Sequence, residues 1–243
     1  MNSGSYAACA GLVAQDQALE LAAHNLANLN TTGYRAQQPV FQSVMAARAV
    51  ALNPVAAAVN NFGVIGGSRI DLTPGSLEQT GNPLDLGIEG SGFFAVQTSQ
   101  GKLYTRNGSF QVSAKGQLVT ASGDLVMGES GPITVPAGAV SVSGDGTVSV
   151  QGSVVGKVAL VQFAPDVAMQ AVGGSYYSSP AGAKAQSGTG SIKQGVLESS
   201  NVNPMVAMVG LIALQRQAEM LQKGLSLFYS EFNRIAANDL PKV

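Results

Sequence analysis

The 243-residue sequence is long enough for one large domain or two modest ones, and its formal net charge of −1 gives no reason to expect nucleic acid or an anionic membrane as a partner. Charged residues make up only 11% of the chain, against about 25% in ordinary soluble proteins, while apolar residues reach 45%. Because so few charges protect a monomer poorly against association, we expect partner subunits to cover much of its surface.

The chain offers little material for chemistry. Its one histidine, His24, and one cysteine, Cys9, exclude a His/Cys metal cluster and an intramolecular disulfide, and they leave few catalytic pairs. Gly90-Ser91-Gly92 lies between two predicted strands rather than before a helix, so it does not fit a dinucleotide-binding loop. We therefore expect a protein that is not an enzyme, with no catalytic, cofactor-binding or metal-binding site.

Signals for membrane insertion or cleavage are also weak. No apolar run approaches the ~18 residues that a spanning helix needs, so we expect no direct membrane insertion. The first basic residue is Arg35, which leaves no positively charged region for a secretory signal, and the eight residues before Cys9 are too few for a lipoprotein signal. If the protein leaves the cytoplasm, we expect it to do so without a cleaved signal peptide.

The first predicted element in chain order is a helix with one narrow apolar stripe. Its stripe residues alternate at spacings of four and three: Ala8, Leu12, Gln15, Leu19, Ala22, Leu26 and Leu29. We predict that the helix ends near Asn30, because Thr31 and Thr32 continue a helix poorly and Gly33 can adopt a left-handed conformation.

From about Leu84 to Phe163 the apolar period changes to two, as expected for strands. Turn signals separate these strands: Asn107-Gly108, Lys115-Gly116, Ser122-Gly123-Asp124 and Gly144-Asp145-Gly146. Without a helical pattern between them, the strands predict an antiparallel sandwich or barrel over residues 84–172, in which 154–163 forms a last long strand. We expect extended connectors over residues 34–83 and 173–199.

A second helix follows, over residues 203–237. Its stripe keeps the same alternation for more than three heptads: Leu211, Leu214, Ala218, Leu221, Leu225, Phe228, Phe232 and Ile235. Asn203 is predicted to cap its first turn, and Pro204 suits a position where no backbone N–H is needed.

A helix with one apolar stripe must bury it. The simplest solution is an α+β protein in which residues 1–33 and 200–243 pair as a coiled coil and the all-β domain lies between them in sequence. An ordinary helical subdomain buried within one monomer is the alternative. The narrow stripe favours the coiled coil, with apolar surface left for neighbouring subunits.

Four stretches of the sequence form recognisable motifs. They are Asn25-Leu26-Ala27-Asn28-Leu29-Asn30-Thr31-Thr32-Gly33-Tyr34-Arg35, Leu84-Asp85-Leu86-Gly87-Ile88-Glu89-Gly90-Ser91-Gly92-Phe93-Phe94, Tyr104-Thr105-Arg106-Asn107-Gly108-Ser109-Phe110 with residues 116–120, and Gly195-Val196-Leu197-Glu198-Ser199-Ser200-Asn201-Val202-Asn203. In this order they resemble the motifs of the bacterial flagellar rod and hook protein family, and the resemblance covers nearly the whole chain. It implies a structural subunit whose terminal helices line the core of a tube, with the β-domain outside.

The resemblance also implies partners and location. It predicts a periplasmic rod of the flagellar basal body, built from copies of this chain and other rod proteins and delivered by the flagellar type III export apparatus. Length and a single β-domain favour a rod protein over the larger hook protein, and Met205-Val206-Ala207-Met208 and residues 217–223 look more like the proximal-rod type. The expected assembly interface combines apolar stripe residues of both helices with the polar motif between them: Leu12, Leu19, Leu26, Asn25, Asn28, Asn30, Thr31, Thr32, Gly33, Tyr34, Leu211, Leu214, Leu221, Leu225, Phe228, Phe232 and Ile235.

Two rival interpretations stay open from the sequence. One is a distal-rod or hook-type subunit of the same family. The other is a phage-tail or adhesin-like fibre protein with a trimeric coiled coil, which would lack the Asn-Leu-Ala-Asn motif at residues 25–28.

Overall fold

The computed structural model describes residues 3–45, 61–164 and 167–239, and the chain divides into two compact units. The helical unit contains residues 1–26, 37–68 and 203–243, and the β unit contains residues 27–36 and 69–202. The β-rich middle between two terminal helices confirms the coarse fold class expected from the sequence.

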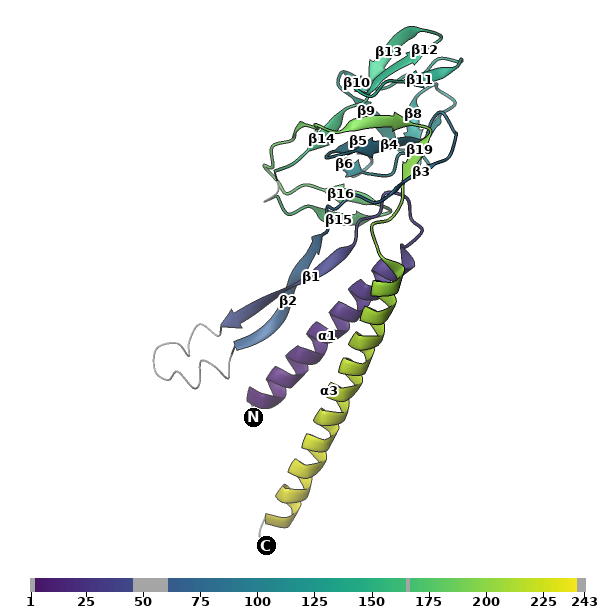
Figure 1. Ribbon diagram of the computed structural model, residues 1–243. Helices are drawn as coiled ribbons and strands as arrows, with labels where there is room; N and C mark the ends of the chain where they lie inside the picture. The colour runs from purple at the N-terminus through teal and green to yellow at the C-terminus, as the bar shows by residue number, and fades with distance from the viewer. Residues whose placement is uncertain (1–2, 46–60, 165–166, 240–243) are drawn as a thin grey trace. The chain divides into compact units, whose positions relative to one another are not determined.

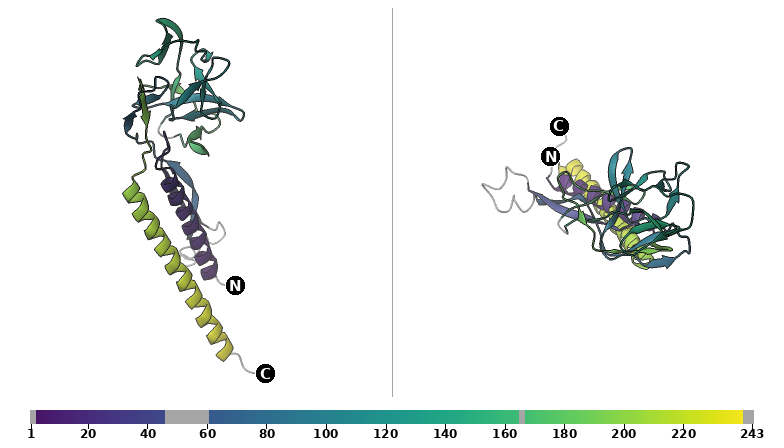
Figure 2. Two further views of the ribbon diagram at one scale, coloured as in Figure 1. Left: turned by 90° about the vertical axis from the view of Figure 1, so that its right-hand side faces the viewer. Right: turned by 90° about the horizontal axis from the view of Figure 1, so that it is seen from above.

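In the helical unit, α1 (Ser3–Ala27) and α3 (Pro204–Asp239) run side by side in opposite directions (Figures 1 and 2). Strands β1 (Gln37–Met45) and β2 (Asn61–Ile70) pair as a two-stranded sheet. The start of α3 confirms the predicted cap, because Asn203 Oδ1 accepts hydrogen bonds from the backbone N–H groups of Met205 at 3.0 Å and Val206 at 3.2 Å.

Helix α1 ends three residues earlier than predicted, at Ala27. The Thr31 N–H donates to the Asn28 carbonyl at 3.2 Å, so a tight turn replaces the next helical turn. Gly33 does adopt the predicted left-handed conformation, with φ of +68°, but it lies six residues beyond the helix and therefore does not cap it.

All described strand pairs of the β unit are antiparallel. Its largest sheet has the order β15-β16-β6-β5-β9-β8-β7, with β10, β14 and β17 attached. The bounds of these strands are β5 (Phe93–Thr98), β6 (Gly101–Thr105), β7 (Phe110–Val112), β8 (Leu118–Thr120), β9 (Leu125–Gly128), β10 (Gly131–Pro132), β14 (Leu160–Gln162), β15 (Gln170–Gly173), β16 (Tyr176–Ser178) and β17 (Gln186–Ser187).

Three smaller sheets complete the β unit. One has the order β11-β12-β13, and the other two are the pairs β18-β4 and β19-β3. Their bounds are β3 (Leu77–Gln79), β4 (Leu86–Glu89), β11 (Val140–Val142), β12 (Thr147–Val150), β13 (Ser153–Lys157), β18 (Ser191–Gln194) and β19 (Val196–Glu198).

Strand β5 is the centre of this unit because both of its faces are buried. Phe94 belongs to one apolar cluster with Phe110 and Val126, while Phe93 and Ala95 belong to a second. Successive side chains of a strand point to opposite faces, so a fully apolar run of this kind marks a strand covered on both sides.

The single long strand predicted over residues 154–163 is wrong. The segment pairs with β12 as β13, and then with β5 and β17 as β14. Between the two strands, Val158 bridges to Gly128. An apolar run in the sequence does not reveal such a change of sheet, because strands of both sheets bury apolar side chains.

The expected connectors also contain strands. Residues 34–83 include β1, β2 and β3, and residues 173–199 include β16, β17, β18 and β19. Since β18 pairs with β4 and β19 pairs with β3, both segments lie in hydrogen-bonded sheets.

Candidate functional site

The residues of the predicted helix stripes are partly buried in the helical unit. Gln15 of α1 is buried, and its Nε2 atom donates to the backbone carbonyl of Leu214 in α3 at 3.0 Å. Leu221 is 38% exposed, and the other described stripe leucines of the helical unit are half-buried: Leu12, Leu19, Leu26, Leu211, Leu214 and Leu225. Phe228, Phe232 and Ile235 lie within α3, but their side chains are outside the described residues.

The opposite side of α3 is apolar and exposed near the start of the helix. Met205, Val209 and Ile212 recur at spacings of four and three, and at 3.6 residues per turn they lie roughly opposite Leu214 and Leu225. Their exposed fractions are 74%, 63% and 52%. A helix that is apolar on two sides needs a second partner.

The expected interface residues at positions 25–34 fall into both units. Asn25 lies in the helical unit, where its side chain donates to the Gln37 carbonyl at 2.8 Å and accepts from the Gln37 N–H at 2.9 Å. In the β unit, the hydroxyl of Thr31 donates to Asn28 Oδ1 at 3.0 Å. Asn30 is exposed and Thr32 is half-buried.

Gly33, Tyr34 and Arg35 are buried within the β unit. The N–H of Gly33 donates to the Glu198 carbonyl at 2.7 Å. A Cβ atom at Gly33 would lie 2.3 Å from the backbone nitrogen of Asn107, so only glycine fits this approach. The end of the motif at residues 25–35 is therefore packed within the β unit, although the motif begins in α1.

Three charged side chains, Arg35, Arg106 and Glu198, form what we call the buried node. Glu198 Oε1 accepts from Arg35 Nη2 at 2.5 Å and from the Gly75 N–H at 2.9 Å, while its Oε2 accepts from Arg106 Nη1 at 3.0 Å. The exposed fractions of Arg35, Glu198 and Arg106 are 0%, 1% and 4%. The node thus holds two positive charges around one negative charge, away from water.

Arg106 is held on several sides. Its Nη2 donates to the Gly90 carbonyl at 2.7 Å, and its guanidinium carbon lies 5.4 Å from the centroid of the Phe93 ring. Burial lowers the pKa of Arg106, the carboxylate of Glu198 opposes that shift, and the positive charge of Arg35 adds to it. The two arginines therefore repel each other, and Glu198 compensates for the repulsion.

Polar contacts extend from the node to the backbone of residues 33–36. The phenol oxygen of Tyr177 accepts from the Arg35 N–H at 2.9 Å, and burial raises the pKa of this phenol. Asn201 Oδ1 accepts from the Ala36 N–H at 2.7 Å, and the Asn201 N–H donates to the Tyr34 carbonyl at 3.3 Å. These bonds satisfy backbone groups that would otherwise be buried without partners.

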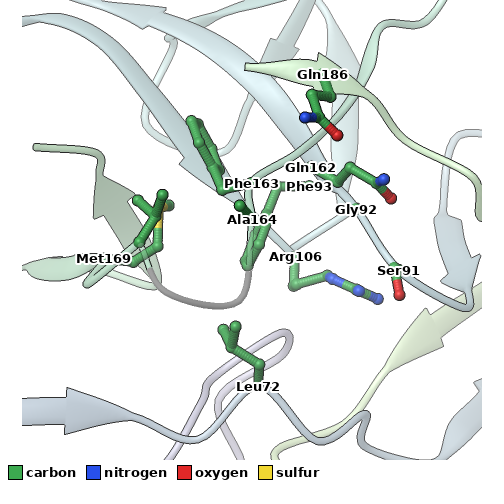
Figure 3. A pocket seen from close by; sticks show the side chains of 11 residues that line it. Leu72, Ser91, Gly92, Phe93, Arg106, Gln162, Phe163, Ala164, Met169 and Gln186 are labelled. Atoms are coloured by element: carbon green, nitrogen blue, oxygen red, sulfur yellow. The ribbon is translucent and has the colours of Figure 1, made fainter. Parts of the chain in front are cut away.

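A cavity of about 350 Å³ lies beside the node in the β unit (Figure 3). Leu72, Phe163 and Met169 supply apolar walls, and Gln162 and Gln186 supply amides. The described lining contains no nucleophile paired with a base and no carboxylate. Across residues 3–45, 61–164 and 167–239, no three His, Cys, Asp or Glu side chains are grouped so as to hold a metal ion.

Arg35, Arg106 and Glu198 lie in the motifs identified in the sequence, but they were not predicted to form a site. One signal was present: in a chain with only 11% charged residues, each of these stretches carries a charge among polar and apolar neighbours. Tyr177 gave no comparable signal.

Three segments match families of flagellar proteins. Residues 6–35 match the family described as Flagella basal body rod protein, residues 87–150 match the Flagellar hook protein FlgE/F/G D1 domain, and residues 193–227 match the Flagellar basal body rod FlgEFG protein C-terminal.

Full-length relatives agree with these matches. The flagellar basal-body rod protein FlgF of Caulobacter vibrioides is 33% identical over 238 residues, which cover 93% of this chain and 92% of the relative. FlgF of Escherichia coli (strain K12) is 36% identical, with coverage of 84% and 85%. FlgG of Buchnera aphidicola subsp. Acyrthosiphon pisum is 32% identical, with coverage of 89% and 92%. The chain belongs to the flagellar basal-body rod family.

The buried node takes one residue from each of the three family segments. Arg35 is the last matched residue of the N-terminal segment, Arg106 lies in the middle segment, and Glu198 lies in the C-terminal segment. Within this rod-family chain, the node is therefore where the three segments are joined. Neither described helix is apolar enough over a sufficient length to cross a membrane.

Proposed function

We propose that this chain is a structural subunit of the flagellar basal-body rod that assembles helically into a drive shaft and transmits torque. The observation that carries the proposal is its similarity, over most of its length, to rod proteins of both the FlgF and FlgG types. The second apolar side of α3, formed by Met205, Val209 and Ile212, supports assembly because it offers a surface for another subunit.

We infer that the subunit is of the FlgF type, which the sequence suggested as the proximal-rod type. Identities of 32–36% to four FlgF relatives, against 27–32% to four FlgG relatives, support this choice. The expected partners are further copies, other rod proteins and the flagellar type III export apparatus. The expected location is the periplasmic part of the basal body.

The stripes of α1 and α3 are proposed to pack as a coiled coil. The hydrogen bond from Gln15 to the Leu214 carbonyl supports this packing, since it joins one stripe to the other. A buried polar residue at a stripe position costs some stability but fixes the register of paired helices. Asn25, Asn28, Asn30, Thr31, Thr32, Gly33 and Tyr34 remain proposed interface residues, with Gly33 and Tyr34 acting through their packing in the β unit.

The buried node is proposed to stiffen the β unit where the chain enters and leaves it. Residues 33–36 and 198–201 lie close to α1 and α3 along the chain, and both are fixed in the β unit by the node and its hydrogen bonds. A load that reaches the β unit along the backbone therefore enters at two rigid points.

The test is complementation in the source bacterium. Deletion of the gene should abolish rods and motility, and the wild-type chain should restore both. Basal bodies purified from the restored strain should contain the chain within the rod, as detected by mass spectrometry and cryo-electron microscopy. A deletion strain with normal rods and motility would contradict the proposed function.

A further inference from the structure

The hydrogen bonds of residues 33–36 go mostly to residues far later in the chain. Their partners at positions 177–201 are the phenol of Tyr177, the carboxylate and carbonyl of Glu198, and the backbone and side chain of Asn201. The only earlier distant partner among the described hydrogen bonds is Asp71, whose N–H donates to the Ala36 carbonyl at 2.8 Å. The N-terminal segment thus depends on the C-terminal one for its place in the β unit.

The charges of the node explain why residues 33–36 need Glu198. Arg35 is fully buried beside Arg106, so two positive guanidinium groups lie close together. Burial is the main cause that lowers the pKa of Arg106, and the positive charge of Arg35 adds to it. Within the described part of the chain, only Glu198 forms ion pairs with both of them. Without this carboxylate, docking of residues 33–36 would bury an unpaired positive charge next to another, and such a burial is strongly unfavourable.

We propose that the buried node is a completion latch: residues 33–36 dock in the β unit only after Glu198 has reached it. A chain emerges from the ribosome with its N-terminus first, so Arg35 and Arg106 are present long before Glu198. Until then Arg35 stays in water and the segment that follows α1 stays undocked. Arrival of Glu198 then fixes this segment and the one that precedes α3 in a single step.

Only the biological role of the latch rests on the proposed function. In a rod subunit the latch would leave residues 33–36 undocked until the C-terminal segment of the β unit has also folded. The latch itself is a property of the folded chain, and it can be measured on the purified full-length protein.

The experiment is hydrogen exchange in the full-length chain and its Glu198→Gln variant. The amides of Gly33, Arg35 and Ala36 should exchange at least roughly a hundredfold faster in the variant, because a broken buried ion pair releases the segment. Amides of β5 at residues 94–96 should keep their protection. Unchanged exchange at residues 33–36 would overturn the latch.

A triple variant separates charge from packing. Arg35→Met, Arg106→Met and Glu198→Gln together remove all three charges of the node and keep similar side-chain volumes. The triple variant should restore protection at residues 33–36 to within about tenfold of wild type, since isosteric apolar replacement of a complete buried ion-pair group is tolerated. If the triple variant exchanges as fast as Glu198→Gln alone, the charge argument fails.

Glu89→Gln is the matched control. Glu89 pairs with Lys193 on the surface, where the two side chains are 56% and 49% exposed, so its loss should leave exchange at residues 33–36 unchanged. Faster exchange there would show that any lost carboxylate loosens the segment and would overturn the latch. The complementation experiment is independent, because rods can fail to form while the exchange pattern holds.

Discussion

At the scale of single residues, Gly33 shows how closely the node is packed. Its φ of +68° lies in the left-handed region. A Cβ atom at this position would lie closest to the backbone atoms of Arg106 and Asn107. Glycine is required here for two reasons, conformation and space. Gly123 has a similar φ of +87° but nothing within 4 Å of a built Cβ, so its requirement is conformational only.

Gly33→Ala should therefore destabilise the β unit more than Gly123→Ala. We expect a loss of about 1–2 kcal/mol at Gly123 from the left-handed conformation, and about 2–5 kcal/mol at Gly33, where overpacking adds to it. Urea unfolding followed by circular dichroism measures both changes in the free energy of unfolding. Equal losses in the two variants would show that the approach of Gly33 to Asn107 is not close.

At the scale of elements, local signals in the sequence were the most reliable. The turn signals at residues 115–116, 122–124 and 144–146 each lie between consecutive paired strands. Glycine marks such turns because it adopts the positive φ that a tight turn requires. The start of α3 was equally local. The division of residues 154–163 depended on distant partners and was missed, and the end of α1 was predicted three residues too late.

Replacement of the α3 cap should affect only that helix. Asn203→Ala should cost about 1 kcal/mol, because the N–H groups of Met205 and Val206 lose the oxygen that accepts from them. Hydrogen exchange at these two amides should rise, while strand β5 stays protected. Asn203→Asp, which keeps the accepting oxygen, is the control and should behave like wild type.

At the scale of the whole molecule, the exposed side of α3 should matter for assembly and not for folding. The Ile212 side chain is 52% exposed, so a charge placed there by Ile212→Asp stays in contact with water and the monomer should fold normally. In the rod the charge would be desolvated against a neighbouring subunit, at a cost of several kcal/mol. We expect the variant to be unable to restore rods in the deletion strain, as seen in purified basal bodies.

Gln217→Asp is the control for that experiment, because it adds the same charge at another exposed position of α3. Rods should form with this variant. If Ile212→Asp also restores normal rods, the apolar side of α3 is not an assembly surface.

The sequence by itself determined the order of helix, β-rich middle and helix, the cap of α3, many of the turns and the family, because each depends on residues close together in the chain. Its motifs contained Arg35, Arg106 and Glu198 but gave no reason to connect them. Only the tertiary structure decided that these three charges share one buried node. The reason is physical: a buried charge is tolerated only beside its partner, and that partner lies up to 163 residues away in the chain.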